Sequence, residues 1–358
     1  MLRKLALALA ALLATAVAGE LAYRTFSTRA DELAEPVAKL RQYLESGHRL
    51  FAPHPYTTFV LASGDHDSAA PDPLGWGFRR AKTPGVPRIA CLGASTTQEG
   101  YPDELQLMLF EEGRLAECMN WGVSGWTSME TMINWFVNVQ DYEPDIVIVH
   151  LGGNDVAPRK VAGFRPDYGH FRQPWSEPRF SWWSSALCRV SDFYAGHVVE
   201  HQGFDIADFV NRSGVSREDR RNDPGGDLTP DTAHPFRRNI ATVCEHALAT
   251  GRTPVLMTMP WQPDAASPHR ERAEGLLLQG LVEHNAILRE LADELGLLLV
   301  DAAAACESRP ELWSPTFTDL VHQNREGRRL KARLVADALQ AVELPPVPAE
   351  LRGASRDR

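Results

Sequence analysis

The chain has 358 residues, of which 44% are hydrophobic and 23% are charged, so it can bury a core of ordinary size without disulfides or a metal. Its formal net charge is -10, and no run of Lys or Arg is longer than two residues. A nucleic-acid binder usually presents a basic face, so this composition argues against nucleic acid as a partner.

Residues 1–24 have a composition of their own. Arg3 and Lys4 are followed by an uncharged apolar run that ends at Gly19. A basic start and an apolar run are typical of a signal peptide, and an uncleaved membrane anchor is also open, although the run is shorter than the ~20 residues of a full span. Both interpretations place the rest of the chain in the cell envelope or outside, either anchored facing outward or periplasmic or secreted.

Residues 25–87 are expected to form a stalk and an extended lead-in. A polar, helix-compatible stretch over residues 29–47 is followed by residues 48–87, which are rich in Pro, Gly and Asp and show little periodicity.

Regular alternation of strands and helices begins at Arg88. Short apolar runs predict strands, and longer amphipathic stretches predict helices. Thr127 and Glu130 have the spacing of a capping box, which predicts a helix start. The expected strands are 88–92, 116–120, 146–151, 254–259 and 297–300, and the expected helices are 102–112, 127–139, 236–250, 271–295 and 325–342.

Residues 155–235 interrupt this pattern. They hold many Pro, Arg, Asp and Trp and lack clear strand runs, so they are expected to form an irregular insertion over the sheet. Residues 343–358 are expected to be a disordered tail.

The alternation predicts an α/β fold. We expect a three-layer α/β/α sandwich around a central, mostly parallel five-stranded sheet, with an N-terminal hydrophobic helix and the insertion added to it. Residues 88–342 would form this main domain. In such sheets ligands bind beyond the carboxyl ends of the strands.

Small and polar residues follow three of the expected strands. These turns are Gly93 to Thr97, Asn120 to Gly125 and Gly152 to Asp155, and the sheet rule places all three at one edge. Asp319 and His322 stand close together before the last helix. A serine hydroxyl needs a base to become a nucleophile, so Ser95 with His322 as base and Asp319 as its orienting acid form an expected catalytic triad. Backbone N–H groups of Ser95 and Gly125 and the side-chain amide of Asn154 are the expected oxyanion donors.

These four blocks resemble those of the SGNH hydrolases, also called GDSL-type esterases and lipases. Gly93-Ala94-Ser95-Thr96 is similar to the nucleophile block, and Asp319-x-x-His322 is similar to the block with the acid and the base. The resemblance implies the flavodoxin-like SGNH fold and carries the two remaining oxyanion roles to Gly125 and Asn154. Ala94 departs from the name motif, which has Asp there, but it removes no triad member.

The resemblance implies a serine hydrolase that cleaves carboxylic esters through a Ser95 acyl-enzyme. A small-molecule, lipid or glycan ester is the expected substrate, with no cofactor and no metal. One alternative keeps the site and transfers an acyl group, often acetyl, to an envelope glycan. A non-catalytic binding module and a zinc peptidase are further alternatives, the latter because residues 197–201 match the pattern H-x-x-E-H.

The cysteines and several tryptophans are expected to have mainly structural roles. The five cysteines form no C-x-x-C pair, and Cys91 and Cys118 are expected to be inert core residues. Packing of the insertion is expected to be the main role of Trp175, Trp182, Trp183 and Trp261, which could otherwise line an acyl or sugar pocket. Oligomeric state does not follow from the sequence.

Overall fold

The computed structural model describes residues 2–28, 30, 33–34, 37–38, 40–41, 51–61, 78–172, 182–202, 228–262 and 272–348. The chain divides into two compact units, each of which combines separate stretches of sequence. One unit holds Met1–Pro53 and Pro174–Asn211, and the other holds His54–Gln173 and Arg212–Arg358.

A parallel sheet forms the centre of the second unit. Its five strands, as the described residues show them, are ordered β4-β3-β5-β6-β7, and every neighbouring pair is parallel. Their bounds are β3 Arg88–Gly93, β4 Glu117–Gly122, β5 Ile146–His150, β6 Thr253–Met257 and β7 Leu298–Val300. The chain steps from β3 to β4 on one side and then returns to β5 on the other, so a topological switch point lies between β3 and β5.

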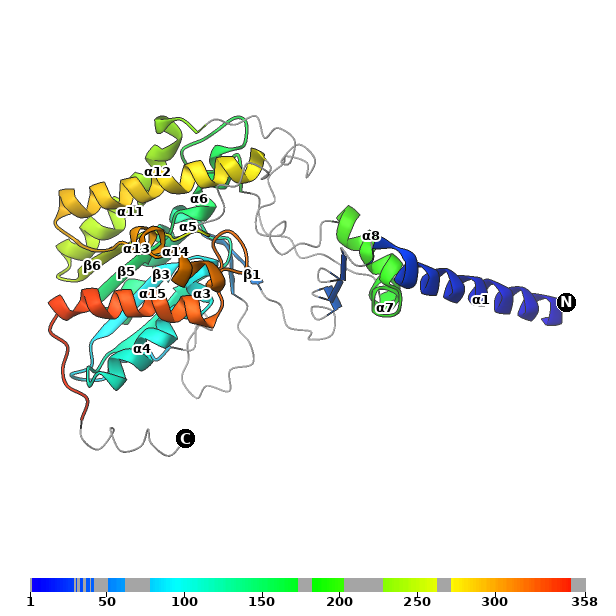
Figure 1. Ribbon diagram of the computed structural model, residues 1–358, viewed down its shortest axis with the longest axis horizontal. Coiled ribbons are helices and arrows are strands. Elements are labelled where there is room, and N and C mark those ends of the chain that lie inside the picture. The colour runs from blue at the N-terminus through cyan, green and yellow to red at the C-terminus, as the bar shows by residue number, and fades with distance from the viewer. Residues whose placement is uncertain are drawn as a thin grey trace. The chain divides into compact units, whose positions relative to one another are not determined.

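Helices cover both faces of this sheet (Figure 1). Ala90 and Leu92 of β3 pack towards α5, α11 and α12, whereas Ile89 and Cys91 pack towards α4 and α15. Both faces of the sheet are therefore buried, which is why the central strands hold continuous apolar runs, such as Ile89 to Leu92 in β3 and Ile146 to Val149 in β5. The helix bounds are α4 Tyr101–Glu111, α5 Ser128–Val137, α11 Pro230–Ala249, α12 Arg272–Leu295 and α15 Arg325–Ala338.

Shorter elements connect these layers. They are β2 Thr58–Leu61, α3 Ser95–Gln98, η1 Val139–Tyr142, α6 Gly153–Arg159, α13 Ala302–Ser308, α14 Pro310–Trp313, η3 Ser314–Thr316 and η4 Leu339–Ala341, and β1 spans Phe51–His54.

This architecture confirms the expected three-layer α/β/α fold with five parallel strands. The five predicted strands match β3 to β7 within two residues at each end, and the predicted long helices match α4, α5, α11, α12 and α15. The largest shift is at α11, which begins at Pro230 rather than at residue 236. Thr127 and Glu130 form the predicted capping box at the start of α5.

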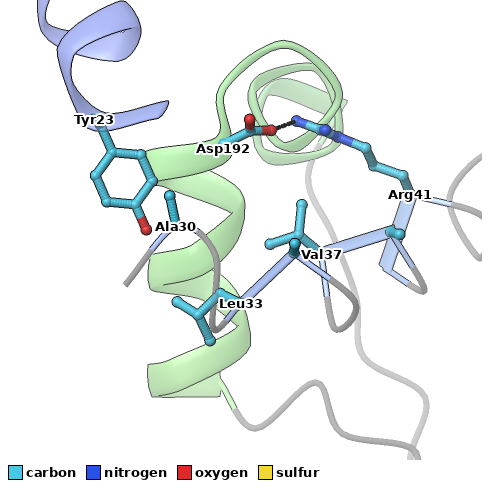
Figure 2. Close-up of a pocket in the computed structure, with 8 residues that line it drawn as sticks. Tyr23, Ala30, Leu33, Val37, Arg41 and Asp192 are labelled. Carbon is cyan, nitrogen blue, oxygen red and sulfur yellow. Dashed lines mark ion pairs between the residues drawn. The ribbon is translucent and has the colours of Figure 1, made fainter. Parts of the chain in front are cut away.

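The first unit holds the N-terminal helix α1, Leu2–Phe26, together with α7, Trp182–Val190, and α8, Asp192–Gln202. The Glu20 carboxylate accepts hydrogen bonds from the Ser191 hydroxyl at 2.7 Å and from the backbone N–H groups of Asp192 and Phe193, so it caps the start of α8. Arg41 and Asp192 form an ion pair of 2.6 Å beside a cavity of about 430 Å³ that Tyr23, Leu33 and Val37 also line (Figure 2).

Among the described residues no helix, α1 included, is long and apolar enough to cross a bilayer. The prediction that residues 1–24 form a transmembrane anchor therefore gains no support, although the predicted N-terminal helix is present.

Two expectations about irregular segments need correction. The described part of residues 155–235 is largely helical, because it contains α7, α8 and the first turns of α11, and residues 174–211 belong to the unit of the N-terminal segment. The expected disordered tail starts too early, because the backbone of residues 345–347 pairs with that of residues 113–115. Two hydrogen bonds, Leu115 N to Pro345 O at 2.7 Å and Val347 N to Gly113 O at 2.9 Å, and the burial of Val347 hold this stretch.

Candidate active site

Ser95 lies at the carboxyl end of β3, at the switch point of the sheet. It is the first residue of α3, and Ala94 occupies the N-cap position, so the Ser95 hydroxyl is not used as a helix cap. Gly93 is in register with Gly122 of β4 and with His150 of β5, so the three strand ends are level and their turns meet at one edge.

The loop before α15 brings a base to this serine. His322 Nε2 lies 2.7 Å from Ser95 Oγ, and His322 Nδ1 lies 2.6 Å from Asp319 Oδ2. A carboxylate only accepts hydrogen bonds, so Nδ1 carries the ring proton and Nε2 is left to accept the Ser95 proton. The three residues chosen from the sequence therefore form one continuous hydrogen-bonded row.

The acid and the base shift each other's pKa. The Asp319 hydrogen bond raises the pKa of His322 above its usual value, against the lowering effect of partial burial. Burial alone would raise the pKa of Asp319, but the His322 ring and the backbone N–H groups of His322 and Val321 outweigh it and lower that pKa to about 2. Asp319 is therefore ionised at neutral pH and holds the imidazole in one orientation.

Gly125 lies in the turn after β4, and this turn is tied to the serine turn. Asn120 Nδ2 donates to Thr97 O at 3.1 Å, and Ser124 N donates to Gln98 Oε1 at 2.7 Å. Gly125 itself has φ 79°, a left-handed conformation that favours glycine. Gly125 is half-buried, and its chain neighbour Ser124 is the residue that is hydrogen-bonded to the Ser95 turn.

Asn154 follows β5 and lies against the same turn. Its Nδ2 donates to the Trp126 carbonyl at 2.9 Å, which uses one of the two amide N–H groups. The second N–H is the one that an oxyanion could accept. Asn154 is half-buried, so part of its side chain is open to solvent.

Asp155 fixes the chain directly after Asn154. It is fully buried and accepts hydrogen bonds from Ser128 N at 2.9 Å and from the Ser128 hydroxyl and the Tyr168 hydroxyl, the last at 3.1 Å. Burial raises the pKa of Asp155 to about 7 against the lowering effect of these bonds. This network joins the start of α5, the β5 turn and the segment around Tyr168.

Some of these supporting residues carried no signal in the sequence. Gln98 and Ser128 lie in no recognisable motif, and the contact between Tyr168 and Asp155 arises only from the fold. Asn120 was part of a recognised block, but its contact with the Thr97 carbonyl depends on the alignment of β3 and β4.

Trp261 lies beside the loop that carries Asp319 and His322. It packs with Met259 and Leu281 against Leu320 and Val321, the two residues between Asp319 and His322. Trp183 is 64% exposed, and Trp175 and the Trp182 side chain lie outside the described residues. Packing of the acid–base loop is therefore the described role of Trp261.

The side chains of Glu200 and His201 in the H-x-x-E-H match lie outside the described residues. Among the side chains that the structure does describe, no group of three His, Cys, Asp or Glu is placed to hold a metal ion. All five cysteines are described, and each is a buried free thiol, as expected for Cys91 and Cys118.

Comparison with known proteins gives one family. The model of the GDSL-like lipase/acylhydrolase family matches residues 89–330 of the chain. No curated protein matches the chain.

Solved structures match over most of the chain. A lipase/acylhydrolase from Enterococcus faecalis is 15% identical over 74% of this chain and 100% of its own, with a TM-score of 0.45. A GDSL-like lipase from Bacteroides thetaiotaomicron is 17% identical over 72% of this chain and 89% of its own, with a TM-score of 0.42. The acetyl xylan esterase AlAXEase is 18% identical over 72% of this chain and 100% of its own, with a TM-score of 0.42.

Proposed function

Because the chain belongs to the GDSL-like lipase/acylhydrolase family, we propose that it hydrolyses carboxylic esters through an acyl-enzyme on Ser95. The observation that carries this proposal is the hydrogen-bonded row from Ser95 Oγ through His322 to Asp319, with distances of 2.7 and 2.6 Å. A hydroxyl against an imidazole whose other nitrogen faces a carboxylate is the arrangement that activates a serine nucleophile.

The first half-reaction forms the acyl-enzyme. His322 Nε2 takes the Ser95 proton while Oγ attacks the ester carbonyl carbon, and Asp319 stabilises the imidazolium that forms. When the tetrahedral intermediate collapses, the imidazolium gives this proton to the leaving alkoxide, and the alcohol departs. In the second half-reaction His322 takes a proton from water, the hydroxide attacks the acyl carbon, and the proton returns to Ser95 as the acid is released.

The oxyanion that forms in both steps needs donors fixed in advance. We assign this role to the backbone N–H groups of Ser95 and Gly125 and to the free N–H of the Asn154 amide. Two hydrogen bonds support the assignment: Ser124 N donates to Gln98 Oε1, and Asn154 Nδ2 donates to Trp126 O. They hold the Ser95 turn and the Asn154 side chain against the turn that contains Gly125.

A glycan ester is one substrate class within this proposal, along with lipid and small-molecule esters. Export also belongs to the proposal and rests on the basic start and the apolar run of residues 1–24. A fusion reporter placed after the full chain and active only in the cytoplasm would argue against export.

The test of the proposed activity is a screen of aryl esters of increasing acyl length. Ser95→Ala serves as the blank, and Ser308→Ala, at an exposed position of α13, serves as the matched control. We expect the wild type and Ser308→Ala to release phenol at equal rates and Ser95→Ala to fall to background. Wild-type turnover in Ser95→Ala would overturn the proposal.

A further inference from the structure

Arg172 is a buried cation that the proposed chemistry leaves unused. Its side chain is 8% exposed, and it lies in the segment after Tyr168, in the stretch that the sequence marks as an insertion. Burying a guanidinium is costly unless its donors find acceptors, so its partners show what it holds in place.

The guanidinium reaches the carbonyl of the proposed oxyanion glycine. Arg172 Nη2 donates to Gly125 O at 2.8 Å and to Glu130 Oε2 at 3.0 Å, and its Nε lies 2.7 Å from Glu130 Oε1. The planar fork thus meets both carboxylate oxygens and one backbone carbonyl at once, which a lysine cannot do. Two aromatic rings, Phe171 and Phe59, flank the guanidinium at 5.3 and 5.9 Å.

Glu130 links this contact to the start of α5. Its carboxylate also accepts from the Thr127 backbone N–H at 2.7 Å as part of the capping box. Residues 125–127 are therefore held through Arg172 and Glu130 on one side and through Asn154, which donates to Trp126 O, on the other.

A glycine in a left-handed conformation has many alternatives, because no Cβ restricts it. The direction of the Gly125 N–H is therefore set by contacts that hold its neighbouring peptide groups. Arg172 makes such a contact at the Gly125 carbonyl, and it is the described side chain that joins this carbonyl to a buried carboxylate.

The geometry points to Arg172 as a positioning residue: it holds the peptide group that follows Gly125 and thereby fixes the direction of the Gly125 N–H towards the oxyanion. This inference rests on the proposed ester hydrolysis. Loss of a whole oxyanion donor typically lowers kcat by about 10²–10³-fold, so a displaced donor in Arg172→Lys should lower kcat by about 10- to 100-fold. KM should change little, because the contact matters most when negative charge develops on the carbonyl oxygen.

The experiment compares Arg172→Lys with Arg88→Lys. Arg88 is also fully buried, pairs with Glu117 at 2.7 Å and donates to backbone carbonyls, but it lies at the opposite end of β3 from Ser95. Both variants are assayed with an aryl ester below their melting temperatures. The affinity of each variant for a boronic acid is measured as well, because the tetrahedral boronate adduct on Ser95 places an oxygen among the oxyanion donors.

We expect Arg172→Lys to lose kcat and boronic acid affinity by similar factors while KM stays close to wild type, and Arg88→Lys to lose stability alone. Wild-type kcat and boronic acid affinity in folded Arg172→Lys would overturn the inference, as would an equal loss of both in Arg88→Lys. If Arg172→Lys does not fold, Glu130→Gln replaces it with the same expected and contradicting results, because Gln keeps a capping acceptor but removes the carboxylate.

Ser95→Ala separates this inference from the proposed function. Turnover that does not depend on Ser95 removes the hydrolase proposal itself. Turnover that depends on Ser95 but not on Arg172 removes only the positioning role.

Discussion

Asp319 acts on His322 through directed hydrogen bonds rather than through deep burial. Its side chain is 55% exposed, and that of His322 is 32% exposed. Salt screens exposed charges, so the orientation of the carboxylate decides its effect. The backbone N–H groups of Val321 and His322 hold Oδ1 at 2.9 and 2.8 Å, which leaves Oδ2 facing the ring.

The pH dependence of turnover tests this pairing. His322 must be neutral to accept the Ser95 proton, and its pKa is raised, so kcat/KM should fall as the pH drops through a value above the usual 6.5. Asp319→Asn removes the main cause of the shift. We expect its acid limb to move to lower pH and its kcat to fall by up to about 10⁴-fold, the loss known for other triads. An acid limb at the same pH in both proteins would show that Asp319 does not act on the base.

Asn154 gives a second test at the level of single residues. Asn154→Asp keeps the side-chain size but replaces the donors, so kcat should fall by about 10²–10³-fold, with the unfolding transition changed far less. Asn138→Asp, at a residue that bonds only to Asn134 in the described side-chain contacts and lies at the far end of α5, is the control. Unchanged turnover in Asn154→Asp would remove Asn154 from the oxyanion site.

The sequence alone identified the five residues assigned to the triad and the oxyanion hole, because each stands in a short block with its own spacing. It did not identify Arg172, Tyr168 or Gln98. Their partners are a backbone carbonyl, a buried carboxylate and a backbone N–H from distant segments, and such contacts leave no local pattern.

At the level of elements, the close approach of β4 to the nucleophile turn shapes the site. A Cβ on Gly122 would lie 2.3 Å from the backbone nitrogen of Gln98 and 2.9 Å from the Ala94 carbonyl oxygen. These are backbone atoms of α3 and its N-cap, so they can give way only if the turn that carries Ser95 moves.

Gly122→Ala should therefore reduce both stability and kcat. Overpacking of this kind usually costs about 1–3 kcal/mol of unfolding free energy, and displacement of the nucleophile should lower kcat in protein that remains folded. Gly275→Ala is the control, because an added Cβ at this α12 position would meet no atom within 4 Å other than those of its chain neighbours and its own helix backbone, and it should be neutral or slightly stabilising. Chemical denaturation and kcat measured together check the prediction, and equal behaviour of the two variants would contradict it.

The strands and long helices were predictable because their apolar periodicity extends over many residues. The short elements α3, α6, α13 and α14 were not, since their 4 to 7 residues are fixed by tertiary contacts. The switch point between β3 and β5 follows from the strand order, which apolar periodicity does not specify.

At the scale of the whole molecule, the chain combines the unit that holds the central sheet and the candidate active site with the first unit, which is made from the N-terminal segment and part of the insertion. The contacts that build the first unit join residues such as Glu20 and Asp192, which are 172 positions apart. Local periodicity cannot reveal such a pairing, which is why the insertion was expected to be irregular.

Glu20 tests whether the first unit matters for the chemistry. Glu20→Gln weakens the cap of α8 and removes the ion pair between Glu20 and Arg24. The local stability of residues 182–202 should fall by about 1 kcal/mol, and their amide exchange should become correspondingly faster. The effect should be present at neutral pH and disappear as the pH falls through the lowered pKa of Glu20. Turnover of a soluble aryl ester should stay unchanged, and Glu294→Gln, in an exposed pair with Arg237, is the control. A matching loss of kcat in Glu20→Gln would show that the two units are coupled in catalysis.

Labelling by an organophosphonate tests the central claim most directly, because the probe reacts only with an activated nucleophile. Peptide mass spectrometry should find one adduct, on Ser95, which is absent in Ser95→Ala and strongly slowed in His322→Ala. An adduct on a different residue, or none in a preparation that hydrolyses esters, would contradict the account.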